Sequence, residues 1–346
     1  ALSTRARLAR NVEGIPFPGH AQESDLKRVA DLVLGAVYES GCQFRHGKLN
    51  RQLKVVRPSH LPSTSHRFSL VDARIASSQH VSGGKHRLIV LDDGGSISLM
   101  VNEEDHLRIQ CILPGFQPMM ALQLAREFDS FLSRKISYAK ADNYGYLTSS
   151  LANVGTGFRL SVMLHLVGLA YLGEVLPVLT AASELKVSIR GMLGEGTRAL
   201  GDVFQVSNET TIGFTEREIA SRIRAVAEHL ISREREARRR LAVERSGELK
   251  EKVQHAWAQL VEARALTGED AMSYLSTLRL GHAIGLHPGI SVKEFSELLV
   301  SMKLVPYALD GYAAVPHMVG TSDDVRRAKL IRDKLLKDDS GSKMTL

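Results

Sequence analysis

Apolar residues recur with helical spacing along several long segments of the chain. They form one-sided stripes over 23–38 and 119–136, which predicts an amphipathic helix in each segment. The segment 161–182 is apolar almost throughout and contains Pro177, so we expect a buried helix that breaks near the proline. Thr215 and Glu218 form a predicted capping box, from which a helix with a charged outer face should continue to residue 245.

A second pattern, of short apolar runs separated by turn residues, predicts antiparallel β-sheet in the first part of the chain. The runs 86–91 and 96–102 are separated by Asp-Asp-Gly-Gly, which tolerates the positive φ angles of a hairpin turn. The stretch 101–110 follows directly and reads Val-Asn-Glu-Glu-Asp-His-Leu-Arg-Ile-Gln. In one extended strand Glu104 and Arg108 project to the same side, as does the histidine between them. We therefore expect a strand face that holds charged groups of both signs.

Two glycine-rich loops lie beside charged residues, and the first of them is either a plain loop or an anion-binding loop. Gly-Thr-Gly at 155–157 precedes Arg159 and the segment that we predict to be helical, and such a loop at a helix entry can present N–H groups to an anion. A short strand that ends at Arg190 leads into a second loop, which carries Glu195, before an apolar strand over 203–206. The chain contains no Gly-x-x-x-x-Gly-Lys-Ser/Thr pattern, so a P-loop is excluded.

The pattern of apolar positions changes near residue 246. From residue 248 onward helical spacing dominates and hairpin signals are absent, so we predict two domains, over 1–246 and 247–346. The predicted fold class is α+β, with an antiparallel β-sheet flanked by helices and followed by a small helical domain. We expect that domain to end in a charged helix.

Composition narrows the functional classes. Lys and Arg outnumber Asp and Glu by 45 to 38, a net charge of +7 that suits phosphate-bearing ligands or nucleic acid. Aromatic residues make up 5%, so a base-stacking surface is not indicated and we expect no nucleic-acid partner. Cys42 and Cys111 lack metal-ligand spacing and imply no disulfide framework. We see neither a signal peptide nor a segment typical of a membrane span, and we expect a cytoplasmic protein.

Charged residues of two kinds lie at strand ends and loop entries in these separate stretches. The arginines are Arg5, Arg7, Arg108, Arg159 and Arg190, and the glutamates are Glu104 and Glu195. Five guanidinium groups could surround a triphosphate while two carboxylates hold a cationic acceptor nearby. Phosphoryl transfer needs this combination of positioning and charge neutralisation, so we predict that reaction class.

Four stretches, taken in order, resemble motifs of the guanidino (phosphagen) kinase superfamily. They read Ser-Thr-Arg-Ala-Arg-Leu-Ala-Arg-Asn from residue 3, Asn-Glu-Glu-Asp-His-Leu-Arg-Ile-Gln from residue 102, Asn-Val-Gly-Thr-Gly-Phe-Arg-Leu-Ser-Val-Met-Leu-His from residue 153, and Arg-Gly-Met-Leu-Gly-Glu-Gly from residue 190. Within the superfamily the chain is most similar to the bacterial protein arginine kinases. The resemblance spans nearly the whole chain.

The resemblance implies a kinase that transfers the γ-phosphoryl group of ATP to arginine side chains of proteins, with Mg²⁺ held mainly by the phosphates. It places Glu104, Glu195 and Ser150 at the catalytic centre, where the glutamates would clamp the substrate guanidinium and help to remove its proton. A nucleotide-contacting histidine of the family would fall at Arg74. The nucleotide-binding residues that it implies are Ser3, Thr4, Arg5, Ala6, Arg7, Arg108, Arg159, Leu160, Ser161, Val162, Met163, Arg190, Gly191, Met192, Leu193, Gly194 and Glu195.

Two positions depart from the pattern of that family. Its Thr-Ser-Cys-Pro-Thr-Asn reads Thr-Ser-Ser-Leu-Ala-Asn here, so Ser150 replaces a reactive cysteine whose thiolate would carry negative charge. Its C-terminal phosphoarginine-sensing motif, Arg-Asp-x-x-Arg-Ala, keeps Asp324, Arg327 and Ala328 but begins with Asp323. The resemblance also implies a homodimer, a zinc-containing activator and a partnership with the Clp protease system in protein quality control.

Four functions remain open from the sequence alone. The chain could be an active protein arginine kinase, an inactive relative that binds ATP or phosphoarginine as a regulator, a kinase for a small guanidino metabolite, or a nucleic-acid binder suggested only by charge. The five arginines with both glutamates favour the active kinase, since a pure binder needs no pair of substrate carboxylates. The altered triplet 150–152 keeps the inactive relative open.

Overall fold

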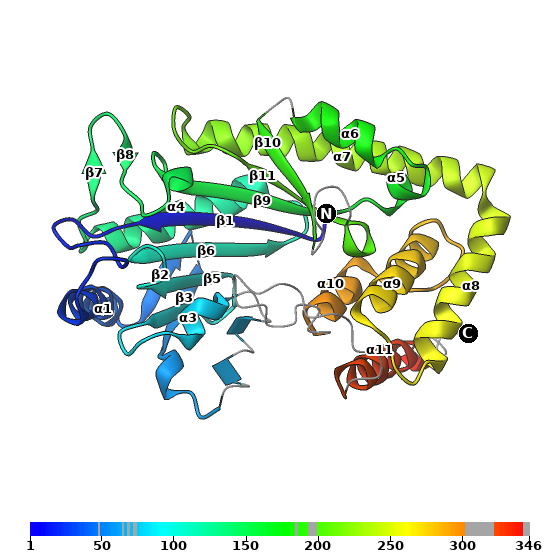
Figure 1. The fold of residues 1–346 in the computed structure, drawn as a ribbon, viewed down its shortest axis with the longest axis horizontal. Coiled ribbons are helices and arrows are strands. Elements are labelled where there is room, and N and C mark those ends of the chain that lie inside the picture. The colour runs from blue at the N-terminus through cyan, green and yellow to red at the C-terminus, as the bar shows by residue number, and fades with distance from the viewer. Residues whose placement is uncertain are drawn as a thin grey trace.

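An antiparallel β-sheet forms the centre of the molecule (Figure 1). The computed structural model describes residues 1–47, 49–63, 66–67, 70–71, 75–183, 186–192, 199–301 and 322–341. Within them the sheet has nine strands, in the order β10 (Val187–Gly191), β11 (Val203–Asn208), β9 (Phe158–His165), β1 (Ser3–Arg10), β6 (Leu107–Pro114), β5 (Ile97–Val101), β4 (Leu88–Asp92), β3 (Leu49–Val56) and β2 (Gln43–His46). This arrangement confirms the predicted α+β class with an antiparallel sheet.

Three helices pack on one face of the sheet and build the main core. They are α1 (Glu23–Glu39), α4 (Pro118–Ser133) and α7 (Glu216–Glu244), and they contribute Val33, Phe128 and Ile223 to the same apolar cluster as Leu8 of β1 and Leu160 of β9. The helical stripes predicted over 23–38 and 119–136 are confirmed. The capping box at the start of α7 is confirmed as well, because the Thr215 hydroxyl accepts the backbone N–H of Glu218 at 3.2 Å.

The helix predicted over 161–182 is wrong in its first part. The chain runs through β9 until His165 and then forms two short helices, α5 (Val167–Tyr171) and α6 (Val175–Ser183). β9 is a central strand in which six of the eight residues are buried, and periodicity cannot distinguish such a run from a buried helix. Pro177 lies in the first turn of α6, where its missing N–H breaks no helical bond. The Gly-Thr-Gly loop accordingly enters a strand and not a helix.

The predicted hairpin is confirmed as β4 and β5, with Leu88 opposite Val101. The single strand expected over 101–110 is wrong, because β5 ends at Val101 and β6 begins at Leu107. Residues 102–106 form a tight connection that Asn102 opens with φ of 62°, a conformation that asparagine tolerates better than most residues. The backbone N–H of Asn102 donates to the carbonyl of His106 at 2.8 Å. Glu104 therefore lies in a turn and does not share a strand face with Arg108.

Several shorter elements connect the strands and helices of the part of the chain that forms the large sheet. They are a two-stranded sheet of β7 (Lys140–Ala141) and β8 (Gly145–Tyr146), the helix α3 (Ser78–Ser82), and the 3₁₀ turns η1 (Pro58–His60), η2 (Leu151–Asn153) and η3 (Leu200–Asp202).

The C-terminal helices pack directly on one end of the sheet, as Figure 1 shows. They are α8 (Ser246–Glu262), α9 (Gly268–Ala283), α10 (Val292–Ser301) and α11 (Ser322–Gly341). Val203 at the start of β11 belongs to their apolar cluster. The hydroxyl of Ser276 on α9 lies 2.7 Å from a carboxylate oxygen of Asp202 and 2.8 Å from Nε2 of His165. The helical C-terminal part is confirmed, and the domain boundary at residue 246 stays a prediction.

In the ranges that the structure describes, no helix has both the length and the apolar character needed to cross a membrane.

An ion pair with a fully buried arginine fixes the end of β1 against the helices behind it. Arg10 has no exposed surface and donates from Nη2 to Asp129 of α4 at 2.8 Å. Its Nη1 donates to the carbonyl of Thr156 at 2.9 Å, and its guanidinium carbon lies 3.6 Å from the centroid of the Tyr146 ring. Glu216 at the start of α7 lies 3.7 Å away. Arg10 thus joins β1, α4 and α7 through contacts that water does not screen.

We expect Asp129→Ala to lower the free energy of unfolding by about 3–5 kcal/mol, because the change leaves a buried guanidinium without its nearest partner. Asp31→Ala is the matched control, since Asp31 pairs with Lys27 at 3.8 Å and both side chains are more than half exposed. Removal of such a surface pair costs about 0–1 kcal/mol. Urea unfolding monitored by circular dichroism measures both values, and equal small losses would contradict a structural role for Arg10.

Candidate active site

The strand register gathers five arginines on the face of the sheet opposite the main core. Arg7 lies directly opposite Arg159 on β9, and Arg108 lies opposite Ala9, two residues beyond Arg7. Opposed residues and alternate residues of a strand share a face. Arg5 therefore joins this set, and its Nη2 lies 3.4 Å from the side-chain oxygen of Gln205. We call this surface the arginine face.

Arg190 reaches the arginine face through two further strands. It lies opposite Gln205 on β11, which lies opposite Met163 on β9, four residues beyond Arg159. Each step keeps the side chains on the same face of the sheet. All five arginines that the sequence singled out are thus brought together.

Arg7 and Arg159 lie among other positive charges on the arginine face. Burial and the charges of Arg5, Arg108 and Arg159 lower the pKa of Arg7. Burial and the charges of Arg190 and Arg108 lower the pKa of Arg159. The Nε atoms of Arg7 and Arg159 are buried and have no hydrogen-bond partner among the described residues. A bound polyanion would supply both the missing charge and the missing acceptors.

Glu103 holds Arg108 in place, a role that the sequence did not indicate. Its carboxylate accepts from Nη1 of Arg108 at 2.7 Å and from the hydroxyl of Ser77 at 2.7 Å. Burial alone would raise the pKa of Glu103, but the charge of Arg108 and these hydrogen bonds lower it to about 2. Only the turn over 102–106 brings Glu103 to Arg108, so a strand assumption could not find this pair.

Buried polar side chains fix that turn against the end of β1. The side-chain N–H of Asn11 donates to Asp105 at 2.7 Å, and its side-chain oxygen accepts the backbone N–H of His106 at 2.9 Å. Burial lowers the pKa of His106 to about 4, so the ring is neutral at pH 7. Its Nδ1 can then accept the backbone N–H of Val12, at 3.1 Å. His106 is thereby a structural residue of the turn.

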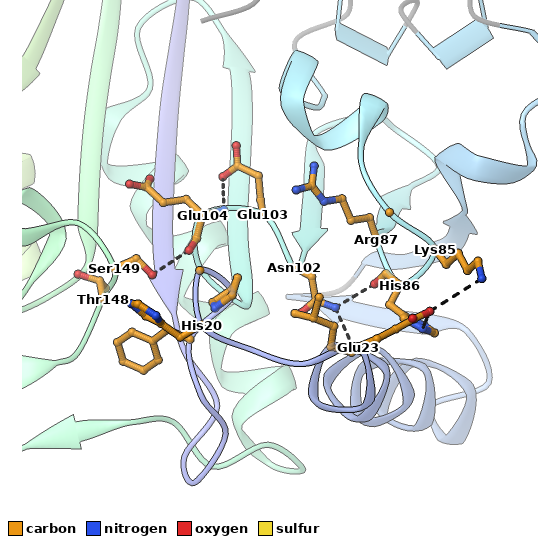
Figure 2. A pocket seen from close by; sticks show the side chains of 15 residues that line it. His20, Glu23, Lys85, His86, Arg87, Asn102, Glu103, Glu104, Thr148 and Ser149 are labelled. Carbon is orange, nitrogen blue, oxygen red and sulfur yellow. Dashed lines mark hydrogen bonds and ion pairs between the residues drawn. The ribbon is translucent and has the colours of Figure 1, made fainter.

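Glu104 projects from this turn beside the arginine face. Burial and the charges of Asp105 and Glu103 raise its pKa, while Arg108 and Arg7 act in the opposite direction. The carbonyl of Glu104 accepts the hydroxyl of Ser149 at 2.8 Å, as Figure 2 shows. A carboxylate with a raised pKa is better suited to accept a proton than an ordinary surface glutamate.

The loop that carries Ser150 is anchored next to Glu104. The backbone N–H of Ser149 donates to Asp105 at 2.7 Å, and the Thr148 hydroxyl donates to the carbonyl of Ser150 at 2.8 Å. Ser150 is the N-cap of η2, whose first residue, Leu151, is 89% exposed. The structure therefore brings Ser150 into the neighbourhood of Glu104, as the resemblance implied.

A cavity of about 760 Å³ adjoins Glu103 and Glu104 (Figure 2). It lies between the segment from Phe17 to Leu26, the turn that holds His86, and the loop at Thr148. Apolar side chains and charged side chains of both signs line it. The cavity can accommodate an extended group that approaches Glu104.

The remaining predicted nucleotide residues divide between the two faces. Thr4, Ala6, Leu160 and Val162 are completely buried on the core face, so they support the arginine face as scaffold. On the arginine face the register places Ser3 opposite Met163 and Ser161 opposite Arg5, and Gly191 and Met192 follow Arg190. Leu193, Gly194, Glu195 and Arg74 lie outside the described residues.

The residues of the proposed sensing motif lie together on α11, in the C-terminal helices. The carboxylate of Asp324 lies 2.6 Å from Nη1 of Arg327, which also donates to the carbonyl of Leu266 at 2.6 Å. Ala328 is completely buried in the apolar cluster of these helices. Asp323 is exposed and pairs with Arg326 at 3.1 Å.

Among the described residues, no group of three or more His, Cys, Asp or Glu side chains could hold a metal ion.

Comparisons with known proteins agree with this geometry. The family model "ATP:guanido phosphotransferase, C-terminal catalytic domain" matches residues 43–237, and "Protein-arginine kinase McsB C-terminal domain" matches residues 246–344. A protein-arginine kinase of Desulforamulus reducens is 40% identical over 96% of this chain and 91% of its own length. One from Halalkalibacterium halodurans is 38% identical over 98% of this chain and 93% of its own.

A solved structure of lombricine kinase shares the fold, with a TM-score of 0.56 and 21% identity over 68% of this chain and 66% of its own. The arginine face, the adjoining Glu104 and the near full-length similarity lead to one conclusion. This chain belongs to the ATP:guanido phosphotransferase family and, within it, to the protein-arginine kinases.

Proposed function

We propose that this chain transfers the γ-phosphoryl group of ATP to the guanidinium groups of arginine side chains in proteins. The observation that carries the proposal is the position of Glu104, between a dense arginine face and a large cavity. One side offers positive charge for the phosphates, and the other offers room for the acceptor. In-line transfer requires the two reactants to meet between such surfaces.

The arginine face would bind the triphosphate of ATP. Arg7 and Arg159 have buried Nε–H groups without an acceptor among the described residues, and phosphate oxygens fit such donors. Glu103 keeps Arg108 oriented toward the same ligand. Mg²⁺ would be held mainly by the phosphates, because the described residues offer no cluster of three ligands for it. When bound, the ion neutralises phosphate charge during transfer.

Glu104 would hold the substrate guanidinium and accept its proton. Burial and the charges of Asp105 and Glu103 raise its pKa, which makes it a stronger base than an exposed glutamate. The anchored turn over 102–106 limits its movement. Glu195, which lies outside the described residues, is proposed as the second carboxylate, and Ser150 as the neutral neighbour of the guanidinium.

The size of the cavity supports a polypeptide acceptor. At about 760 Å³ it leaves room beyond one guanidino group for residues that flank a target arginine. The exposed Leu151 next to Ser150 offers an apolar contact at the edge of this region. The relatives are named protein-arginine kinases, which supports the same substrate class. The homodimer, the zinc-containing activator, the Clp partnership and sensing through Asp324, Arg327 and Ala328 stay predictions.

We expect Arg159→Ala or Arg108→Ala to weaken ATP binding roughly ten- to a hundredfold, since a charge-assisted contact contributes about 1.5–3 kcal/mol. Isothermal titration with ATP measures the effect. Arg224→Ala is the matched control, because that side chain is exposed on α7 and pairs with Glu228. Unchanged affinity in both site variants would remove the nucleotide site from the arginine face.

Glu104→Gln keeps the size of the side chain and removes the base, so we expect transfer to slow by a factor on the order of a hundred or more with near-normal ATP affinity. Radiolabel transfer from ATP to an arginine-rich protein and to free arginine, with a check for acid-labile label, measures the activity and the acceptor class. Glu248→Gln, an exposed change on α8, is the control.

The pH dependence of transfer tests the same residue. Because the pKa of Glu104 is raised, the unaltered enzyme should lose activity as pH falls through that value, at a higher pH than an ordinary glutamate would cause. Glu104→Gln should lack this acid limb. Loss of ATP binding in step with activity would instead indicate that Glu104 only supports the turn. Transfer to neither acceptor by the unaltered protein would favour a regulatory relative.

We expect Ser150→Cys to raise turnover roughly ten- to a hundredfold, because a thiolate would add one charged contact to the guanidinium. The gain should appear only above the pKa of the new thiol, about 8.5 for an unperturbed cysteine. Ser150→Ala should change turnover little. The triple change to Cys-Pro-Thr at 150–152 is also compatible with the backbone, since Leu151 is the first residue of η2, where proline is tolerated. Abolition of activity by Ser150→Ala, with no gain from either cysteine variant, would overturn this role.

A further inference from the structure

A second large hollow lies beside α4, away from the arginine face. It has a volume of about 770 Å³ and is formed by α4, the β2–β3 hairpin and the first turn of α7. We call it the α4 groove. α4 packs on the core face of the sheet, so the sheet separates the groove from the arginine face. A ligand in the α4 groove therefore cannot share the proposed nucleotide site.

The floor of the α4 groove is apolar and already formed. Phe44 of β2 is 2% exposed, and its ring packs edge-on against Phe131 of α4 with a centroid separation of 5.7 Å. Met119 and Leu122 extend the floor along the same helix. Because these side chains pack against the main core, a partner would meet a rigid surface and would not have to order it.

The rim of the α4 groove is strongly basic. Arg45, Arg126, Arg134 and Arg217 line it. The one lining carboxylate, Glu127, is in contact with His46. Arg126 pairs with Glu216 at 3.2 Å, whereas Arg45, Arg134 and Arg217 form no ion pair with any residue in the described ranges. These three guanidinium groups are exposed, and together with the apolar floor they are complementary to a ligand that brings both negative charge and apolar side chains.

We propose that the α4 groove docks an acidic segment of a partner protein in which carboxylates alternate with leucine or phenylalanine. The carboxylates would meet Arg45, Arg134 and Arg217, and the apolar side chains would cover Phe131 and Met119. A second copy of this chain is a poor occupant, since its net charge is +7. Nucleic acid would bring phosphates to the rim and bases to the floor, and the oligonucleotide measurement below distinguishes it from a peptide.

Fluorescence anisotropy with the full chain tests this docking. The probe is a short labelled peptide in which Asp and Glu alternate with Leu and Phe, and we expect saturable binding. The double change Arg134→Ser with Arg217→Ser should weaken binding roughly ten- to a hundredfold, because it removes two charge-assisted contacts. The matched control is Lys27→Ser with Arg28→Ser, an exposed basic pair on α1 that should leave binding unchanged.

Two further measurements separate docking from general charge attraction. A peptide of equal charge with Ser in place of Leu and Phe should bind roughly tenfold more weakly or worse, and Met119→Gln should weaken the original peptide independently of the arginines. Equal binding of the two peptides, equal loss in the α1 control, or no binding at all would overturn the proposal. So would a single-stranded oligonucleotide that binds more tightly than the peptide and loses affinity in the same double variant. None of these readouts depends on phosphoryl transfer.

Discussion

The alternation of side chains along β1 is the constraint on which both the core and the candidate site depend. β1 lies between β6 and β9, so each of its residues is opposed on both sides. Ala6 and Leu8 enter the main core, while Arg5 and Arg7 project from the other face. A slip of one residue would exchange the two sets and bury both arginines. Because the core must be filled with apolar side chains, it fixes the register of β1. That register in turn assembles the arginine face.

The arginine side chains on the two faces of β1 lie in different surroundings. Arg10 enters the protein interior, where Asp129 and the Tyr146 ring give it permanent partners. Arg7 and Arg159 face one another with buried Nε–H groups that lack an acceptor among the described residues, and burial with repulsion from other arginines of this face lowers the pKa of both. Folding must overcome that repulsion, and a polyanion that binds only the folded chain would offset it. Stability and ligand binding are thereby linked through the same guanidinium groups.

The packing of α9 links the C-terminal helices to the end of the sheet nearest Arg190. Gly201 and Asp202 both have positive φ angles at the start of β11, and a Cβ on Gly201 would meet Met272 of α9 at about 2.5 Å. Ser276 of the same helix contacts both Asp202 and His165. β11 pairs with β10, which carries Arg190. The strands that position the arginine face are thus in direct contact with the helical part.

The sequence determined the local structure wherever one signal was unambiguous. The Asp-Asp-Gly-Gly turn, the Thr215 capping box and the stripes of α1 and α4 each depend on nearby residues, and all were confirmed. The four motifs in series were enough to indicate the family and the residues of the arginine face. These features could be predicted because turn chemistry, helix capping and amphipathic spacing act over a few residues.

Only the tertiary structure decided features that depend on contacts between distant segments of the chain. β9 reads as a buried helix in isolation, and its pairing with β1 on one side and β11 on the other makes it a strand. The turn over 102–106 is held by Asn11, which donates to Asp105 and accepts from His106 although both lie far along the chain. That turn places Glu103 on Arg108 and Glu104 beside the cavity, which no pattern within 101–110 could indicate. Long-range polar contacts have no local signature, so they appear only once the sheet has brought the segments together.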